Sequence, residues 1–229
     1  MNTATYHGTW LYSEPPPLEW HSGDCDDTAL LDRRAWHLAH KCENIVDMVV
    51  RAKHFATQCH HGIFRKYEKP PVPYIVHPER VANRTAKLPG ATPAMVAAAW
   101  LHDVREDCGV SNEVLTFLFP EDPLVAAYVD DLTNRFKDAI DPKTGALLRR
   151  AERKRLEFER IKTVRPETKR IKLVDRIDNL GDMQTNGDWG FVLKYAGEGE
   201  QLSQVAGDAD PILNKELLAV IAAIRATKK

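Results

Sequence analysis

The 229-residue sequence lacks a long hydrophobic run, and no apolar stretch approaches the roughly 20 residues that a helix needs to cross a bilayer. Its beginning also lacks a basic segment followed by a hydrophobic one, which is the pattern of a secretory signal peptide. The formal net charge is −1, so the chain has no basic excess of the kind that general nucleic-acid binders carry. We therefore expect a soluble cytoplasmic protein that binds neither membranes nor, in a stable way, nucleic acids.

Cysteine is scarce and irregularly spaced. The four cysteines are Cys25, Cys42, Cys59 and Cys108, and no two of them form a Cys-x-x-Cys pair. The chain therefore lacks the spacing that is typical of thiol-based zinc and redox motifs. Reduced thiols in a cytosolic protein are the simplest interpretation.

The sequence also lacks stretches in which polar and apolar residues alternate, which argues against a β-rich fold. Apolar residues recur instead at the helical period, and prolines stand where several helices would begin. We expect helices at residues 27–38, 45–59, 78–87, 93–103, 112–118, 123–133, 147–163, from 166 past Asp175, 191–205 and 211–227. The chain is long enough for one substantial core and too short for two full domains. The sequence thus predicts an all-α protein.

Residues 1–28 differ in composition from the rest, and residues 29–229 form the predicted single domain. A run of three prolines ending at Pro17 cannot lie inside a helix. The segment also contains Trp10 and Trp20, whereas disordered tails have few aromatic residues. We interpret it as an irregular extension that docks onto the domain or onto a neighbouring subunit, which leaves a homo-oligomer open.

The adjacent residues His102 and Asp103 carry the strongest chemical signal, because they lie in an otherwise apolar, Ala-rich helix. Burying even a neutral polar group without a partner costs about 2–7 kcal/mol, and a charged group costs more. A divalent metal ion would offset that cost. Glu106 and Asp107 follow one turn later. The i, i+4 spacing places Glu106 on the same helix face as His102, and Asp107 on the same face as Asp103.

Two residues elsewhere complete a candidate ligand set. His77 precedes a proline, which limits the freedom of the local backbone. Asp175 interrupts a run of apolar residues, so we expect it to be half-buried and to need a partner. Two imidazoles and two carboxylates suit Mn, Fe, Zn or a similar divalent metal. Simpler explanations remain open: the His-Asp pair could end a helix without a metal, and Asp175 could form a salt bridge with Arg170 or Arg176.

Four motifs occur in order between about residues 45 and 185. They are His61-Gly-Ile-Phe-Arg65-Lys66, Pro73-Tyr74-Ile-Val-His77-Pro78, His102-Asp103 with Glu106-Asp107, and Lys172-Leu-Val-Asp175-Arg-Ile-Asp-Asn179. In order and context they resemble the HD-superfamily hydrolase domain of the RelA/SpoT family. Because no synthetase region follows, the chain is most similar to the stand-alone small alarmone hydrolases.

This resemblance implies an all-α helical bundle of the HD type and a manganese-dependent enzyme. The implied reaction removes the 3′-pyrophosphate from guanosine tetra- and pentaphosphate, giving GDP or GTP and pyrophosphate. The matched positions imply a set of ligands for Mn²⁺, or for another divalent transition metal, at His77, His102, Asp103 and Asp175. They also imply an acidic pair that acts on the attacking water and the leaving group, Glu106 and Asp107, and contacts to the nucleotide from Arg65, Lys66 and Asn179.

The sequence departs from the family pattern beside the expected nucleotide site. The loop at residues 67–73 is longer than the family's, Asp178 stands where a His is usual, and Asp182 stands where a small hydroxyl residue is common. An added carboxylate near a polyphosphate would repel it unless the carboxylate is turned away or bound to a metal. Two alternatives therefore remain open: an HD hydrolase of an adenosine alarmone, a nucleoside monophosphate or NADPH, and a catalytically silent nucleotide sensor. The complete set of ligand and acidic residues argues against the sensor.

A basic run at residues 149–155 has two interpretations. It could clamp a terminal phosphate, with Lys154 or the nearby Lys143 reaching it, or it could be a solvated helix face. Because Glu residues interleave with the basic ones, we favour the solvated face. Tyr195 is a further candidate for lining the pocket.

Overall fold

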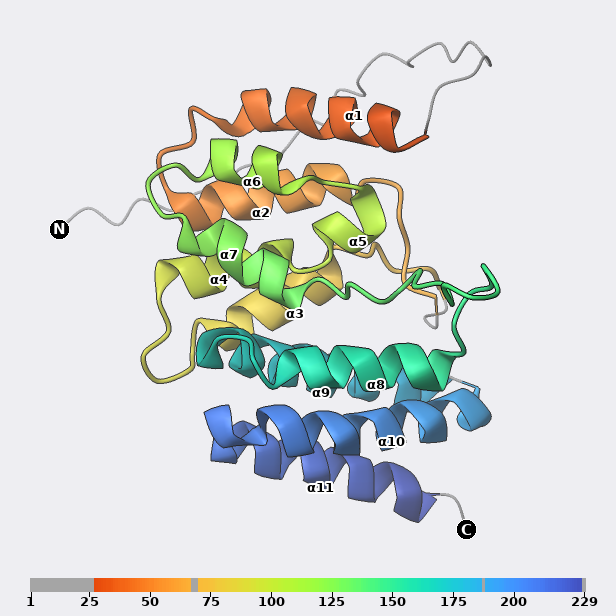
Figure 1. Ribbon diagram of the computed structural model, residues 1–229. Coiled ribbons are helices and arrows are strands. Elements are labelled where there is room, and N and C mark those ends of the chain that lie inside the picture. The colour runs from red at the N-terminus through yellow and green to blue at the C-terminus, as the bar shows by residue number, and fades with distance from the viewer. Residues whose placement is uncertain (1–26, 67–69, 187, 228–229) are drawn as a thin grey trace, which may run out of the picture.

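The computed structural model describes residues 27–66, 70–186 and 188–227 (Figure 1). Nearly all of the predicted N-terminal extension, including Trp10 and Trp20, lies outside the described residues, as does part of the 67–73 loop. The described residues form α-helices, one short 3₁₀-helix and two isolated β-bridges, and this part of the chain contains no strand. The prediction of an all-α fold is confirmed.

The four longest helices have 16 to 21 residues and lie near the two ends of the described chain. In order, the elements are α1 (Asp27–Cys42), α2 (Met48–Cys59), α3 (Val76–Thr85), α4 (Pro93–Leu101), α5 (Val104–Cys108), α6 (Asn112–Leu118), α7 (Leu124–Leu132), α8 (Arg150–Ile161), α9 (Pro166–Asn186), α10 (Trp189–Ala206), η1 (Gly207–Ala209) and α11 (Pro211–Thr227).

Side-chain caps set where several helices begin. The Asp47 carboxylate accepts a hydrogen bond from the backbone NH of Val50, so α2 starts three residues later than the apolar pattern predicts. The hydroxyl of Thr92 caps α4 in the same way, and that of Ser111 caps α6. These caps satisfy backbone NH groups that have no partner within the first helical turn.

The predicted single helix through the His-Asp pair is wrong, because α4 ends before the pair and α5 begins after it. The side chain of His102 donates from Nδ1 to the backbone oxygen of Ala99 at 2.8 Å, and so occupies a carbonyl that the continuing helix would have used. His102 and Asp103 therefore form a turn, with Glu106 and Asp107 on the short helix α5 that follows.

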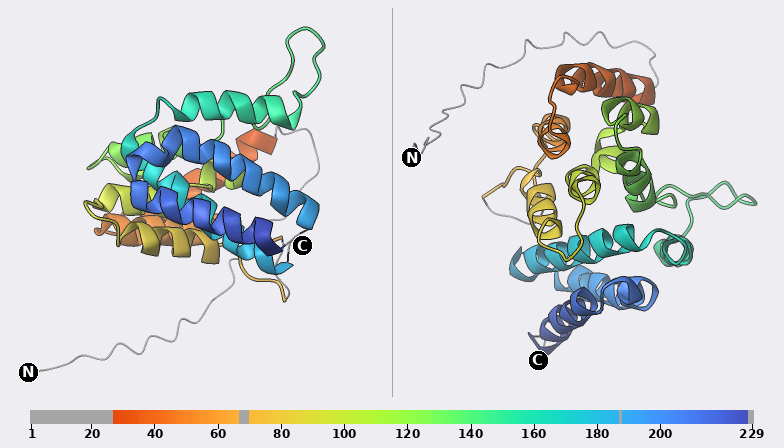
Figure 2. Two further views of the ribbon diagram at one scale, coloured as in Figure 1. Left: turned by 90° about the horizontal axis from the view of Figure 1, so that it is seen from below. Right: turned by 90° about the vertical axis from the view of Figure 1, so that its left-hand side faces the viewer.

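The helices pack in layers around two central elements, α4 and α9 (Figures 1 and 2). α4 packs against α2, α3 and α7, and most of its side chains are buried. α9 packs against α3, α10 and α11. One continuous cluster of buried hydrophobic residues extends from α1 to α11. The candidate ligands His77, His102 and Asp175 belong to α3, the end of α4 and α9, so this packing brings the three together.

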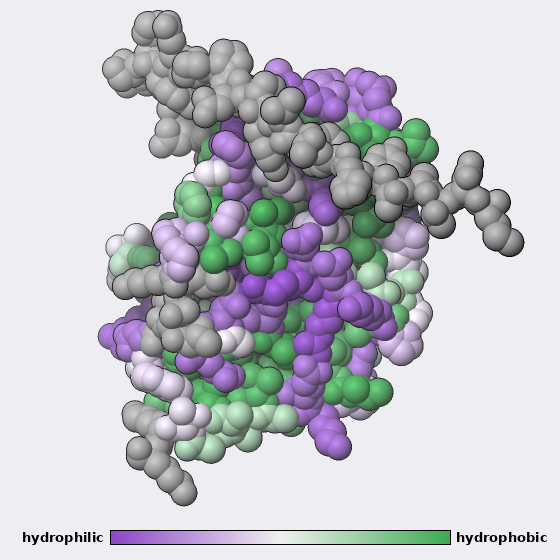
Figure 3. All heavy atoms as spheres, turned by 180° about the vertical axis from the view of Figure 1, so that it is seen from behind, coloured by the Kyte–Doolittle hydropathy of each residue, from purple (hydrophilic) through white to green (hydrophobic). Residues whose placement is uncertain are grey.

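The surface is mixed in polarity, and the face opposite that of Figure 1 carries hydrophilic groups beside separate hydrophobic patches (Figure 3). Such a surface is expected where each outer helix buries one side only. Among the described residues, no helix has the length and hydrophobicity that crossing a membrane requires.

Candidate active site

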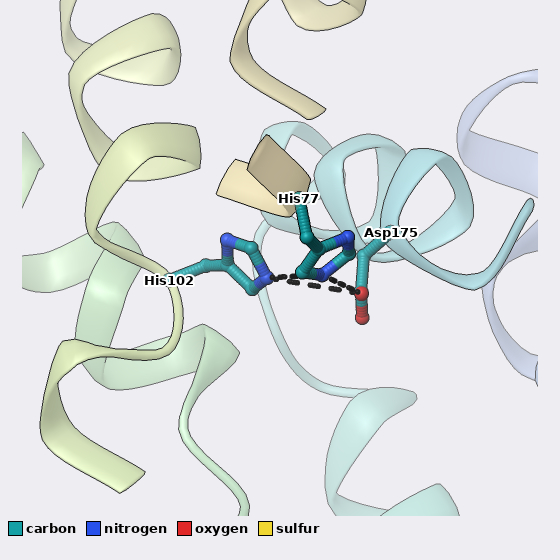
Figure 4. Close-up of side chains that lie close together, drawn as sticks. All are labelled: His77, His102 and Asp175. Atoms are coloured by element: carbon teal, nitrogen blue, oxygen red, sulfur yellow. Dashed lines mark hydrogen bonds and ion pairs between the residues drawn. The ribbon is translucent and has the colours of Figure 1, made fainter. Parts of the chain in front are cut away.

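Three side chains from distant parts of the sequence converge on one point in the interior (Figure 4). They are His77, His102 and Asp175, all buried, and their potential ligand atoms lie within 4.8 Å of one another. Nε2 of His77 lies 3.1 Å from Nε2 of His102 and 3.2 Å from Oδ1 of Asp175. We call this trio the metal corner.

The outer nitrogen of each imidazole is fixed by the protein. Nδ1 of His77 donates to Oδ2 of Asp178 at 2.6 Å, and Nδ1 of His102 donates to the Ala99 carbonyl at 2.8 Å. The two Nε2 atoms face each other at 3.1 Å, so either a proton on one of them or a cation between them has to offset the repulsion of their lone pairs. Imidazoles oriented in this way are typical of metal sites. The donor set fits a divalent transition metal.

The carboxylates make the metal corner attractive to positive charge. Burial alone would lower the pKa of His102, but Asp103 and Asp175 raise the pKa to about 9. Burial would raise the pKa of Asp175, but the hydrogen bond with His77 and the nearby charges of His102 and Lys172 hold it below its ordinary value. Asp175 therefore stays ionised, and it forms no salt bridge with Arg170 or Arg176, which pair with Asp210 and Glu198.

The fourth predicted ligand, Asp103, lies beside the trio. Its Oδ2 is 2.9 Å from Nε2 of His102 and 3.7 Å from Nε2 of His77. The same oxygen accepts a hydrogen bond from the hydroxyl of Tyr74 at 2.7 Å. Asp103 is thus close enough to join a shared cation after a small rotation, and its assignment as a ligand stays a prediction.

A cavity of about 200 Å³ opens next to the metal corner. Its lining includes the acidic residues Asp103, Glu106 and Asp107 and the basic residues Lys154, Lys172 and Arg176. We call the first group the acidic wall and the second group the basic wall. Tyr195 also lines the cavity, as the sequence predicts.

The acidic wall contains two carboxyl groups with perturbed acidity. Burial raises the pKa of both Glu106 and Asp107 above the ordinary value. Oε1 of Glu106 accepts a hydrogen bond from the backbone NH of Asn134 at 2.8 Å, which fixes the direction of the carboxyl group. Carboxyl groups whose pKa is raised toward neutrality are suited to proton transfer.

The basic wall contains a desolvated lysine. Burial, followed by the positive charge of Arg176, lowers the pKa of Lys154 to about 8. The interleaved Glu residues predict a solvated face for the whole basic run, and that holds for the exposed Arg155, which pairs with Glu152. Lys154 is different because it shares a helix face with the buried Phe158, four residues later. That spacing is the signal that distinguishes Lys154 from its neighbours.

The predicted nucleotide contacts are only partly brought together. Arg65 donates to Oδ1 of Asn179 at 2.9 Å and to Oδ2 of Asp182 at 2.7 Å, and its guanidinium lies 5.4 Å from the centre of the Tyr74 ring. Asn179 in turn donates to Oδ1 of Asp175 at 2.6 Å. Lys66 is exposed, and its contact to the nucleotide stays a prediction.

Arg80 is a residue that the sequence did not reveal. It donates to Asp178 through two nitrogens and to Asp182 through one of them. The two carboxylates that depart from the family pattern are thus each paired with an arginine. Arg80 lies three residues after His77 on α3, and Asp178 lies three residues after Asp175 on α9. The sequence does not show that Arg80 and Asp178 pair, because their contact depends on the packing of α3 against α9.

No family model matches the chain. Guanosine-3′,5′-bis(diphosphate) 3′-pyrophosphohydrolase MESH1 of Xenopus tropicalis is 32% identical over 138 residues, which are 60% of this chain and 70% of that protein. The Homo sapiens protein of the same name is 33% identical over 136 residues, 59% of this chain and 69% of that protein. The solved structure of a metazoan orthologue of SpoT that hydrolyses ppGpp superposes with a TM-score of 0.64 and 26% identity, covering 77% of this chain and 94% of that one.

Proposed function

The chain belongs to the family of guanosine-3′,5′-bis(diphosphate) 3′-pyrophosphohydrolases represented by MESH1, and we propose that it hydrolyses the 3′-pyrophosphate of guanosine tetra- and pentaphosphate. The predicted resemblance to stand-alone small alarmone hydrolases and the HD-type helical fold are confirmed. In the proposed reaction, water attacks the phosphorus that is bonded to the ribose 3′-oxygen, the bond between that phosphorus and that oxygen breaks, and GDP or GTP and pyrophosphate are released. The observation that carries the proposal is the metal corner, which opens onto a cavity with one acidic and one basic wall.

The metal corner would hold the cation. We assign His77, His102 and Asp175 as its ligands, with Asp103 as the fourth, and Mn²⁺ as the metal. A bound divalent ion supplies charge for phosphate oxygens and lowers the pKa of water from 15.7 toward about 7. The buried His and Asp side chains hold their ligand atoms in place, because each has a second hydrogen-bond partner.

The acidic wall would move protons. Glu106, whose carboxyl is oriented by Asn134, accepts the proton of the attacking water. Asp107 lies on the same short helix and lines the same cavity, so it assists proton transfer at the leaving oxygen. The raised pKa of both groups supports these roles.

The remaining side chains would bind the substrate. Lys154, Lys172 and Arg176 present positive charge to the phosphates. Arg65 and Asn179 lie next to Asp175 and contact the nucleoside, where a planar guanidinium can stack on a purine. The exposed Lys66 would add a further contact to the nucleotide. We also propose that residues 29–229 form a single domain and that the protein is cytoplasmic.

Product analysis tests this proposal. The metal-free protein is incubated with Mn²⁺ and, separately, guanosine tetraphosphate, its adenosine analogue and NADPH. We expect GDP and pyrophosphate from the first substrate and little turnover of the others. Faster turnover of another nucleotide would be consistent with a catalytic metal at the metal corner, but it would reject guanosine tetraphosphate as the substrate. If the metal binds and none of the three nucleotides turns over, the proposed reaction is rejected, and the chain either acts on a different nucleotide or is a sensor.

A further inference from the structure

Arg80 connects two carboxylates that flank the candidate active site. Its Nε lies 2.7 Å from Oδ1 of Asp178, and its terminal nitrogen lies 2.9 Å from Oδ2 of the same group. The terminal nitrogen also donates to Oδ2 of Asp182. Arg80 belongs to α3 and both carboxylates belong to α9, one helical turn apart. The planar fork of a guanidinium is suited to such two-point pairing.

One branch of this network leads to the metal corner. Oδ2 of Asp178 accepts the Nδ1 hydrogen of His77 at 2.6 Å, and this bond directs Nε2 of His77 at the other ligand atoms. A carboxylate behind a metal-bound imidazole fixes the tautomer and the orientation of the ring. Because Arg80 holds Asp178 at both oxygens, it also fixes the direction from which the carboxylate meets His77.

The other branch leads to the nucleotide side. Oδ2 of Asp182 accepts hydrogen bonds from both Arg80 and Arg65. Arg65 also bonds to Asn179, which bonds to the predicted ligand Asp175. The chain of hydrogen bonds thus runs from His77 through Arg80 to Arg65 and returns to the metal corner.

The charges explain why such a link is needed. Asp178 and Asp182 are additional carboxylates beside a site for a polyphosphate, and unpaired they would repel the substrate. Arg80 donates to both of them, and Arg65 donates to Asp182. Because Arg80 pairs with Asp178 through two nitrogens and with Asp182 as well, these ion pairs also link α3 to α9. The thermal midpoint is therefore measured beside the metal affinity, which a purely structural link would not change in a folded variant.

We propose that Arg80 is a positioning residue that holds His77 in its metal-binding orientation through Asp178 and holds Arg65 in its nucleotide-binding orientation through Asp182. The second half of this inference rests on the proposed function. The first half concerns only the metal corner and stands without it.

Metal titration tests the first branch. Metal-free wild type, Arg80→Ala and Arg80→Lys are titrated with Mn²⁺ by calorimetry, with Arg84→Ala as the matched control. Arg84 lies one turn further along α3, is similarly exposed and pairs with Glu216 of α11, away from the site. We expect Arg80→Ala to bind Mn²⁺ about 10-fold or more weakly, as is typical when a partner behind a ligand is lost. Arg80→Lys recovers part of the affinity, and Arg84→Ala keeps all of it.

Two further variants separate the branches. Asp178→Asn keeps an acceptor for His77 but removes the charge, so we expect a loss of Mn²⁺ affinity with little change in KM at saturating metal. Asp182→Asn leaves His77 untouched, so we expect a higher KM for guanosine tetraphosphate and wild-type metal affinity. Arg80→Ala combines both defects, and at saturating Mn²⁺ its kcat recovers while its KM stays high. Circular dichroism and thermal midpoints confirm that each variant is folded.

The outcomes distinguish this inference from the proposed function. Wild-type Mn²⁺ affinity in folded Arg80→Ala, or a wild-type KM at saturating metal, would overturn the positioning role. If the wild type itself turns over no guanosine tetraphosphate, the proposed function fails, and the metal titration still decides whether Arg80 supports His77.

Discussion

The metal corner and the basic wall differ in how far the protein itself completes them. In the metal corner, each ligand has a second partner that fixes its orientation: Asp178 for His77, the Ala99 carbonyl for His102 and Asn179 for Asp175. In the basic wall, the pKa of Lys154 is lowered by burial and then by the charges of Arg176 and Lys172, which line the same cavity. Arg176 shares Glu198 with Arg150. The ligands of the metal corner are thus oriented by partners within the protein, whereas like charges oppose one another in the basic wall.

The largest effect should come from breaking the metal corner. In Asp175→Ala, two imidazoles remain without the carboxylate that faces them, so we expect Mn²⁺ binding and turnover to fall to background. Helix content should change little, since the side chain packs among buried neighbours of α9 without capping it. Calorimetry, product analysis and circular dichroism measure the three quantities. The control is Asp208→Ala, whose carboxylate is 78% exposed and pairs with Lys169. Full activity in Asp175→Ala would reject the ligand assignment.

We expect the second largest effect on turnover from the loss of Glu106, the proposed general base. Glu106→Gln keeps the acceptor for the Asn134 NH but cannot take a proton, so kcat should fall about 10²–10⁴-fold while metal affinity is retained. Because burial raises the pKa of Glu106, the acidic limb of the wild-type kcat profile should lie above pH 4.5, as the base form is lost when the pH falls through the raised pKa. Glu113→Gln, on the exposed side of α6, is the control. An unchanged kcat in Glu106→Gln would assign the proton transfer to another group.

A smaller effect should come from the basic wall. Lys154→Met removes one charge-assisted hydrogen bond, so KM should rise about 10-fold with little change in Mn²⁺ affinity. The pKa of Lys154 is lowered to about 8, and the ammonium is lost as the pH rises through that value. The wild-type KM should therefore increase above pH 8, and Lys154→Arg should abolish the increase because arginine stays charged.

The neighbouring Arg155 provides the control for the basic wall. Arg155→Met removes an exposed side chain that pairs with Glu152, so both KM and its pH profile should match the wild type. If Lys154→Met behaves in the same way, the basic wall does not bind phosphate and the contrast with the metal corner fails.

We expect the smallest effects from the predicted nucleotide contacts, where a side chain held by hydrogen bonds can be compared with an exposed one. Arg65 is held by Asn179 and Asp182, whereas Lys66 is exposed. Arg65→Ala should raise KM more than Lys66→Ala does, and neither should change Mn²⁺ affinity greatly. Steady-state kinetics at saturating metal measures both. The reverse order would mean that Lys66 reaches further into the site than its exposed position suggests.

The sequence predicts that His77, His102 and Asp175 belong to one site, and the structure brings these three side chains together. An Asp in an apolar run is a local signal of such a site, whereas His77 before a proline becomes a candidate ligand only beside the other motifs, and both residues prove to be buried. Helices with strong caps or first-turn prolines are equally well predicted: α6 at residues 112–118 and α11 at 211–227 match their expected bounds. Local chemistry fixes these features, so a single sequence is sufficient.

What the sequence could not predict depends on tertiary neighbours. The break between α4 and α5 results from a bond between the His102 ring and a backbone carbonyl. Arg80 and Asp178 are 98 positions apart and pair only because α3 packs on α9. Lys154 points inward in a run that reads as solvated. In each case the structure depends on a contact with a group that the local sequence pattern does not identify.

The central claim is that His77, His102 and Asp175 bind a catalytic metal, and anomalous diffraction from crystals soaked in Mn²⁺ tests it most directly. The account predicts one strong peak between Nε2 of His77, Nε2 of His102 and Oδ1 of Asp175, with an oxygen of Asp103 turned toward it. No peak at this point, or a stronger one bound by other residues, would contradict the account.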